Sequence, residues 1–288
     1  MFDHIAQNVI DQEIILNHQL ITIRRLDLIH PQISGNKFFK LKHNFIEAKT
    51  KGFNKLLTFG GAFSNHIAAT AFAAHHFGFQ SVGIIRGEEL EFQTRNHTLA
   101  LAEHFGMKLH FISRQDYRQK NELSFLKQLE NLFPDHYVIP EGGTNDLALK
   151  GTREILNNLD QHFDIICCAV GTGGTIAGII ESSQPHQQIL GFSALKGDFL
   201  TNEVQAMTSK TNWKILDDYC FGGYAKTNSD LIDFIQQFET QHNIPLEQIY
   251  TGKMLFGLSD LIAKNTFSND SKILVIHTGG LQGRSFSI

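Results

Sequence analysis

The sequence is poor in cysteine, proline and tryptophan, and it has no long apolar run and no basic run. Its 288 residues include three cysteines, five prolines and one tryptophan. Cys167 and Cys168 are adjacent within an apolar stretch, which indicates buried free thiols in a reducing compartment rather than a disulfide framework. No stretch approaches the roughly 20 apolar residues that span a bilayer, and residues 1–10 lack the basic and apolar regions of a signal peptide. We therefore expect a cytoplasmic protein.

Charge and histidine spacing argue against several classes of ligand. The formal net charge is −4 at pH 7, so electrostatics give no basis for binding nucleic acid or an anionic membrane. The fifteen histidines include no His-Glu-x-x-His pair, and the adjacent His75 and His76 point to different faces of a helix. We expect the protein to bind no nucleic acid, no membrane and no metal ion.

Short apolar runs alternate with helical patterns along the chain, which is typical of a parallel α/β sheet. The pattern predicts strands at 20–27, 56–59, 81–86, 108–112, 137–140, 165–170, 189–193 and 272–276. It predicts helices at 40–51, 65–77, 96–105, 121–132, 148–159, 175–182, 229–242 and 253–264. The length favours two domains or one large α/β domain.

Glycine turns follow three of these strands, at 60–61, 171–174 and 279–280. Ligands of open parallel sheets bind beyond the carboxyl ends of strands, so we expect the three turns on one rim. The turn at 171–174 opens a helix, where free backbone N–H groups attract phosphate, and Thr172 and Thr175 add hydroxyl donors. Ile176 breaks the dinucleotide fingerprint and no Gly-Lys-Thr/Ser follows, which argues against dehydrogenases and nucleotide hydrolases.

Lys37 is the candidate for a covalent ligand bond. It follows Gly35-Asn36, a turn pair that can direct a side chain from a strand end. The charges of Lys40 and Lys42 favour a neutral amine at position 37 and attract phosphate. By itself such a lysine group is most often a solvated basic face. Combined with the phosphate turn and with Ser64-Asn65-His66 at a helix start, it indicates an aldehyde cofactor held by a lysine and anchored through a phosphate.

These segments resemble a known family. Ser34-Gly35-Asn36-Lys37, followed by Lys40-Leu41, resembles the Gly-Gly-Asn-Lys-x-Arg-Lys-Leu segment of the 1-aminocyclopropane-1-carboxylate (ACC) deaminase and D-cysteine desulfhydrase family, which are pyridoxal 5'-phosphate (PLP) enzymes of fold type II. Residues 60–66 are similar to its Gly-x-x-Gln-Ser-Asn-His/Gln turn. Further blocks at 140–145, 171–178, 249–253 and 277–280 occur in the family's order. The resemblance covers most of the chain from about residue 21 onward.

The resemblance implies a fold of two open, twisted, mostly parallel sheets flanked by helices, as in the tryptophan synthase β chain. We expect residues 1–37 and 148–288 to form a larger PLP-binding domain and residues 38–147 a smaller one. The expected partners are a small amino-acid substrate and a second copy of the chain, in a homodimer.

The resemblance also implies the roles of the site residues. Lys37 would bind the cofactor aldehyde and exchange the proton of the substrate α-carbon, with Ser64 and Tyr250 as further catalytic residues. Asn65 would bind the ring hydroxyl. The phosphate would lie against Gly171, Thr172, Gly173, Gly174 and Thr175, and Lys40 and Thr278 would complete the cofactor contacts. The substrate would contact Ser64, Asn65, His66, Tyr224 and Tyr250.

Three positions bear on the reaction. ACC deaminases have Tyr-Glu where this chain has Tyr250-Thr251, and leucine where it has Thr278. A hydroxyl does not supply the charge that keeps the cofactor ring protonated, so the ring is a weaker electron sink. That suits β-elimination, and His66 in place of glutamine indicates the same. We expect D-cysteine to give pyruvate, ammonia and sulfide.

Two alternatives remain open at this stage. One is an ACC deaminase-like ring opening. The other is a PLP-binding homologue without catalysis, suggested by phenylalanines at 38, 39 and 63 where the family has other residues.

Overall fold

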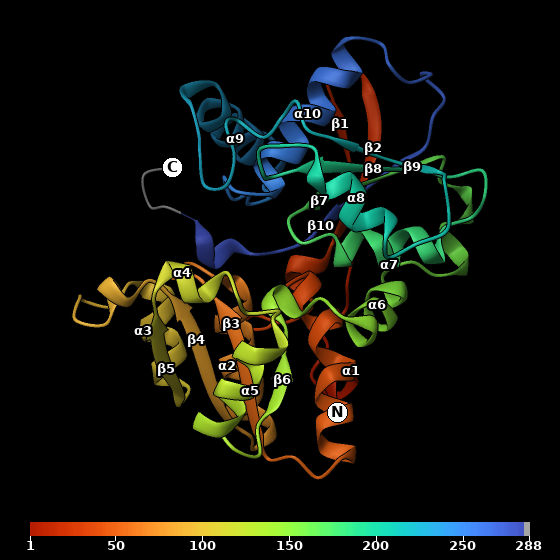
Figure 1. Ribbon diagram of the computed structural model, residues 1–288. Helices are drawn as coiled ribbons and strands as arrows, with labels where there is room; N and C mark the ends of the chain where they lie inside the picture. The colour runs from red at the N-terminus through yellow and green to blue at the C-terminus, as the bar shows by residue number, and fades with distance from the viewer. Residues whose placement is uncertain (285–288) are drawn as a thin grey trace.

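The computed structural model describes residues 1–284, and it contains two sheets flanked by helices (Figure 1). The larger sheet has the order β1-β2-β10-β7-β8-β9 and the smaller one the order β5-β4-β3-β6. Only β1 and β2 pair antiparallel; every other pairing of the described strands is parallel. The predicted fold of two open, mostly parallel sheets is confirmed.

The larger sheet is built from β1 (Asp11–Leu16), β2 (Gln19–Arg25), β7 (Ile165–Val170), β8 (Gln188–Ser193), β9 (Trp213–Leu216) and β10 (Ile273–His277). The smaller sheet is built from β3 (Lys55–Gly60), β4 (Gln80–Arg86), β5 (Met107–Ile112) and β6 (Tyr137–Ile139). The helices are α1 (Asn36–Thr50), α2 (Asn65–Phe77), α3 (His97–His104), α4 (Arg114–Tyr117), α5 (Leu123–Leu132), α6 (Asp146–Thr152), α7 (Gly174–Ser182), α8 (Phe199–Gln205), α9 (Ser229–His242) and α10 (Thr251–Ala263).

The largest departures from the predicted elements are the end of α6, two missed edge strands, two missed short helices and the start of α1. α6 ends at Thr152, whereas the predicted helix continues to residue 159, because the chain passes there into short 3-10 turns. The missed short helices are α4 and α8. β1 and β9 lie at the two edges of the larger sheet, where only part of each strand is buried and the apolar signal is weak. α1 begins at Asn36, four residues before the predicted start, because Gly35 at φ 66° reverses the chain immediately before it. Lys37 therefore lies in the first turn of a helix and not in a strand-end turn.

The division of the strands bears on the domain boundaries. All four strands of the smaller sheet lie between residues 55 and 139, and all six of the larger sheet lie outside that range. Figure 1 shows the smaller sheet in the lower half of the view and the larger one above it. Domains of 38–147 and of 1–37 with 148–288 remain our proposal.

One apolar core joins the two halves. It contains Phe38 and Leu41 of α1, Leu56 of β3 and Ile166 of β7 in a single buried cluster. α1 and α6 approach each other so closely that a β-carbon at Gly151 would lie 1.9 Å from the carbonyl oxygen of Phe39. Packing of this kind fixes the relative position of the strand ends that form the site. No helix within residues 1–284 is long and apolar enough to cross a membrane.

Candidate functional site

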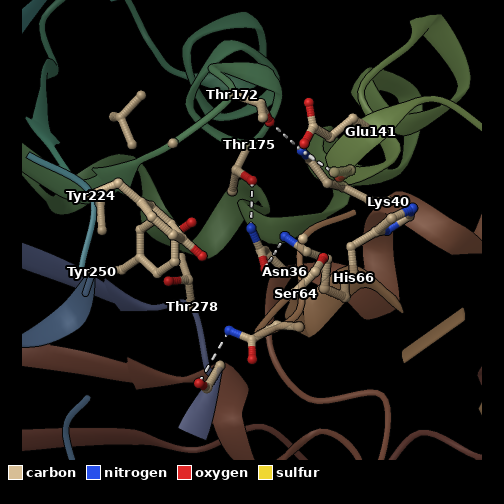
Figure 2. A pocket seen from close by; sticks show the side chains of 18 of the residues that line it. Asn36, Lys40, Ser64, His66, Glu141, Thr172, Thr175, Tyr224, Tyr250 and Thr278 are labelled. Atoms are coloured by element: carbon tan, nitrogen blue, oxygen red, sulfur yellow. Dashed lines mark hydrogen bonds between the residues drawn. The ribbon is translucent and has the colours of Figure 1, made fainter. Parts of the chain in front are cut away.

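A cavity of about 380 Å³ lies where strand ends of both sheets meet. The turns after β3, β7 and β10 contribute to it, as expected for the carboxyl edge of parallel strands. The predicted site residues that line it are Lys37, Lys40, Ser64, Asn65, His66, Gly171, Thr172, Gly173, Thr175, Tyr224, Tyr250 and Thr278. Figure 2 shows Tyr224, Tyr250 and Thr278 on one side of the cavity, with Lys40, His66 and Glu141 on the other.

Lys37 lies half-buried in the cavity wall. Its Nζ is 3.4 Å from Oδ1 of Asn36, and burial lowers the pKa of Lys37 to about 8. Asn36 in turn donates from Nδ2 to Oγ1 of Thr175 at 2.7 Å, which ties the start of α1 to the start of α7. The amine is therefore held in place, and a substantial fraction of it is neutral at physiological pH.

The glycine turn before α7 presents unpaired backbone donors to the cavity. Gly173 has φ 76° and precedes the first helical residue, and no side chain caps this helix. The amides of a first helical turn have no partner within the helix, so here they are available to a ligand. Gly174 does not line the cavity, but a β-carbon there would lie 3.2 Å from Nζ of Lys40. The turn and the lysine are therefore adjacent.

Lys40 is a buried lysine beside this turn. Its side chain is 1% exposed, and its Nζ donates to the carbonyl oxygen of Gly142 at 3.0 Å and to Oγ1 of Thr144 at 2.8 Å and of Thr172 at 3.2 Å. Burial, and then the charge of Lys37, lowers the pKa of Lys40 well below its ordinary value. Within residues 1–284 no carboxylate forms an ion pair with it. An anion at the turn would supply the missing negative charge.

Two buried acceptors at the start of α2 have no partner. Asn65 donates from Nδ2 to the carbonyl oxygen of Gly280 at 3.1 Å, while its Oδ1 is unpaired. His66 contacts Oγ1 of Thr58 through Nε2 at 2.7 Å, and Thr58 donates its proton to the carbonyl oxygen of Ile139 at 2.8 Å. Nε2 of His66 is therefore the donor, which leaves Nδ1 unprotonated and unpaired. Burial, with Lys37 and Lys40 nearby, lowers the pKa of His66 and keeps it neutral.

Tyr224 and Tyr250 form the opposite wall, with ring centroids 6.3 Å apart. Tyr250 precedes α10 and is fixed through the buried carboxylate of Glu247, whose Oε1 accepts from the backbone N–H of Tyr250 at 2.9 Å. Tyr224 follows a loop in which Nζ of Lys253 donates to the carbonyl oxygens of Cys220 and Gly223 at 2.8 and 2.7 Å. Burial raises the pKa of both tyrosines, so both phenols are protonated near neutral pH.

The structure separates two threonines that sequence comparison treats together. Thr278 lines the cavity. Thr251 is fully buried and donates from Oγ1 to Oε1 of Glu247 at 3.1 Å, so its hydroxyl serves the N-terminus of α10 and not the cavity. Only Glu141 brings a carboxylate to the cavity wall formed by the described residues, and it accepts from the hydroxyl of Tyr117 at 2.7 Å.

Sequence reasoning missed several residues of the wall, among them Asn36, Arg86 and Glu141. Arg86 is the last residue of β4 and Glu141 follows β6, so their place at carboxyl strand ends was the available signal. Of the three phenylalanines that depart from the family pattern, Phe63 lines the cavity and is 58% exposed. Phe38 and Phe39 are instead buried in the core.

Comparisons with known proteins agree with this geometry. Residues 15–279 match the family model described as pyridoxal-phosphate dependent enzyme. The chain is 32% identical to a Thermotoga maritima protein named "Putative 1-aminocyclopropane-1-carboxylate deaminase", with 91% of this chain and 89% of that protein covered. It is 30% identical to the mitochondrial bifunctional D-cysteine desulfhydrase/1-aminocyclopropane-1-carboxylate deaminase of Arabidopsis thaliana, with coverage of 91% and 72%.

Solved structures give the same result. The crystal structure of an ACC deaminase homologue superposes with a TM-score of 0.81 at 27% identity and covers 97% of this chain and 91% of its own. A hydrogen sulfide-producing enzyme from Fusobacterium nucleatum shares the fold, with a TM-score of 0.68 at 14% identity over 98% of both chains. The cavity has a lysine amine, an uncapped glycine turn and two unpaired acceptors, as a PLP site requires. These features and the matches together show that the chain belongs to the ACC deaminase and D-cysteine desulfhydrase family of PLP-dependent enzymes.

Proposed function

We propose that this PLP-dependent enzyme is a lyase that carries out β-elimination on a small D-amino acid such as D-cysteine. The reaction consumes one water and gives pyruvate, ammonia and sulfide. The observation that supports elimination over ring opening is the hydroxyl of Thr278 at the cavity wall, where ACC deaminases have leucine. The glutamate that follows the tyrosine in those enzymes is here Thr251, which is bonded to Glu247 and turned away from the cavity.

The described residues fit the cofactor. The amine of Lys37, with its lowered pKa, would hold the aldehyde. The amides at 171–175 and the buried cation of Lys40 would hold the phosphate, and the unpaired Oδ1 of Asn65 would accept from the ring hydroxyl. When bound, PLP supplies an electron sink that stabilises negative charge at the substrate α-carbon.

The residues of the chain bind the substrate and move its protons. The N–H groups at the start of α2 and the hydroxyl of Ser64 bind the α-carboxylate and orient the substrate, and the unprotonated Nδ1 of His66 accepts from a donor group of the substrate. The Lys37 amine takes the α-proton, and the leaving group departs with the electron pair of its bond to the β-carbon. Tyr250 and Tyr224 line the cavity with protonated hydroxyl groups, and either can donate a proton to the departing thiolate.

Substrate preference is the direct test of this proposal. We expect pyruvate and sulfide from D-cysteine with a kcat/KM at least about tenfold above that for L-cysteine. The reason is that the Lys37 base reaches the α-proton from only one face of the bound substrate, so it discriminates between enantiomers. Keto-acid and sulfide assays on D-cysteine, L-cysteine and ACC measure this. Release of α-ketobutyrate from ACC without sulfide from D-cysteine would establish ring opening instead. Cofactor binding without turnover of any amino acid would establish a catalytically silent homologue.

The pKa of Lys37 predicts how cofactor uptake depends on pH. The neutral amine attacks the aldehyde, and its fraction grows as pH rises through about 8. In protein stripped of cofactor, we expect the rate of PLP uptake to rise about tenfold per pH unit below that point and to level off above it. Growth of the visible absorption after PLP addition reports the rate. Nα-acetyl-lysine, whose side-chain pKa is about 10.4, provides the control and should still accelerate at pH 9. A protein rate that follows the control would refute the assignment.

The homodimer and the cytoplasmic location rest on the family resemblance and the composition, and both remain predictions.

A further inference from the structure

A second, smaller cavity of about 180 Å³ adjoins the site and shares Arg86 and Glu141 with it. The remaining residues of its wall are Arg114, Tyr117, Arg118 and Lys120. Four cations and one carboxylate therefore meet beside the main cavity. Such an excess of positive charge attracts anionic ligands.

The charge balance identifies which cations are available. Arg114 pairs with Glu89 at 2.5 Å, and Lys120 pairs with Glu141 at 3.3 Å. Within residues 1–284, the guanidinium groups of Arg86 and Arg118 have neither a hydrogen-bond acceptor nor an ion-pair partner. Of these two, only Arg86 also lines the main cavity. Its charge is therefore free to meet a ligand there.

Arg86 is the last residue of β4, so it projects from the carboxyl end of a central strand of the smaller sheet. Its guanidinium lies 5.8 Å from the ring centroid of Tyr117. A β-carbon on Gly61 would be only 3.6 Å from Nη2 of Arg86, so the group extends over the turn that leads to Ser64. Contact with the tyrosine ring restricts the arginine side chain and lowers the entropy lost when it binds a ligand.

We propose that Arg86 binds a negatively charged group on the side chain of the substrate. The inference rests on the proposed function, in which the N–H groups at the start of α2 bind the α-carboxylate and leave this guanidinium without a role. The substrate class is then a small amino acid whose β-substituent is an anion. In its elimination the α-proton passes to Lys37, the substituent leaves with its bonding electron pair, and one water is consumed to release pyruvate and ammonia.

Binding to the holoenzyme tests the charge preference without turnover. Aspartate and asparagine have nearly the same shape and differ in side-chain charge, so calorimetry with both enantiomers of each isolates that charge. We expect aspartate to bind about tenfold more tightly, as a hydrogen-bonded ion pair contributes about 1.5 kcal/mol or more. Arg86→Gln should abolish this preference. Arg153→Gln, which removes an exposed arginine paired with Glu181, should keep it. Equal binding of the two ligands to the unchanged protein would overturn the proposal.

Turnover separates this inference from the proposed function. O-phosphoserine and O-acetylserine both eliminate a good leaving group, and only the first carries an anion on the β-substituent. We expect kcat/KM to favour O-phosphoserine, and Arg86→Gln to raise its KM about tenfold with little change in kcat. Preferred turnover of O-acetylserine would contradict the role of Arg86 in binding an anion but would still support the lyase activity. If neither compound is turned over but aspartate still binds more tightly than asparagine, the lyase activity is contradicted and the anion-binding role of Arg86 is retained. Inorganic phosphate binding as tightly as O-phosphoserine would show a site for free anions and contradict the substrate assignment.

Discussion

Replacing Lys37 with alanine removes the visible absorption of the bound cofactor and lowers turnover by at least about 10³-fold, the range that a positioned acid–base group contributes. The reason is that, among residues 1–284, no other amine both lines the cavity and is free to bond a ligand. Lys40 lines the same cavity, but its Nζ is already bonded to one carbonyl and two hydroxyl oxygens. An absorption spectrum of the purified variant and its pyruvate production measure the two losses.

The control for this prediction lies on the same helix. Lys49 is exposed on α1, thirteen residues or about three and a half turns after its first residue, Asn36, so Lys49→Ala should keep both spectrum and activity. If Lys37→Ala retains a visible band that withstands gel filtration, another residue holds the cofactor and the assignment of Lys37 is wrong. The thermal midpoints of both variants show whether a loss of activity reflects unfolding.

Gly35→Ala is expected to prevent assembly of the site. Gly35 has φ 66°, and a β-carbon at this position would lie 1.8 Å from the carbonyl oxygen of Thr278. The same carbonyl accepts from the backbone N–H of Asn36 at 3.1 Å, so it does not move away without loss of that bond. We expect the free energy of unfolding to fall by about 3 kcal/mol or more, through overpacking and backbone strain combined. Urea unfolding and cofactor content measure the effect.

Gly52→Ala separates the two causes. Gly52 also has a left-handed backbone, with φ 79°, but no atom lies within 4 Å of the position a β-carbon would take. Its substitution should therefore cost only the conformational penalty, about 1 kcal/mol, and should leave cofactor binding unchanged. Equal losses for the two variants would show that the contact with Thr278 contributes nothing, contrary to our expectation.

The sequence was most informative where one local rule decided the structure. β7 is a run of buried apolar residues, and its predicted bounds of 165–170 agree with the structure. The bounds of α2 were also correct, because Ser64 caps its start and Gly78, in a left-handed conformation, ends it. All the residues predicted for the cavity except Gly174 line it, because glycine turns at parallel strand ends share one edge of the fold.

What the sequence could not show depends on contacts between distant segments. The free amides at the start of α10 need an acceptor, and Glu247 supplies it, so the side chain of Thr251 faces Glu247 and not the cavity. Nothing in the residue types of Thr251 and Glu247 indicates this pairing. Arg86 reads as an ordinary surface arginine, since its importance comes from Gly61 and Tyr117, which approach it only in the folded chain. Burial of Lys40 is likewise a property of the packing between α1 and the turns at 142–144 and 172.

The bond between the amide of Asn36 and the carbonyl of Thr278 has a consequence for biosynthesis. The ribosome makes Asn36 long before Thr278, and it makes Asn65 long before Gly280, whose carbonyl accepts from the Asn65 side chain. A nascent chain halted between residues 37 and 278 therefore has its reactive lysine but lacks the part of the cavity wall formed by residues 278–280. We therefore expect stable PLP binding only after residues 278–280 have left the ribosome and joined the cavity wall.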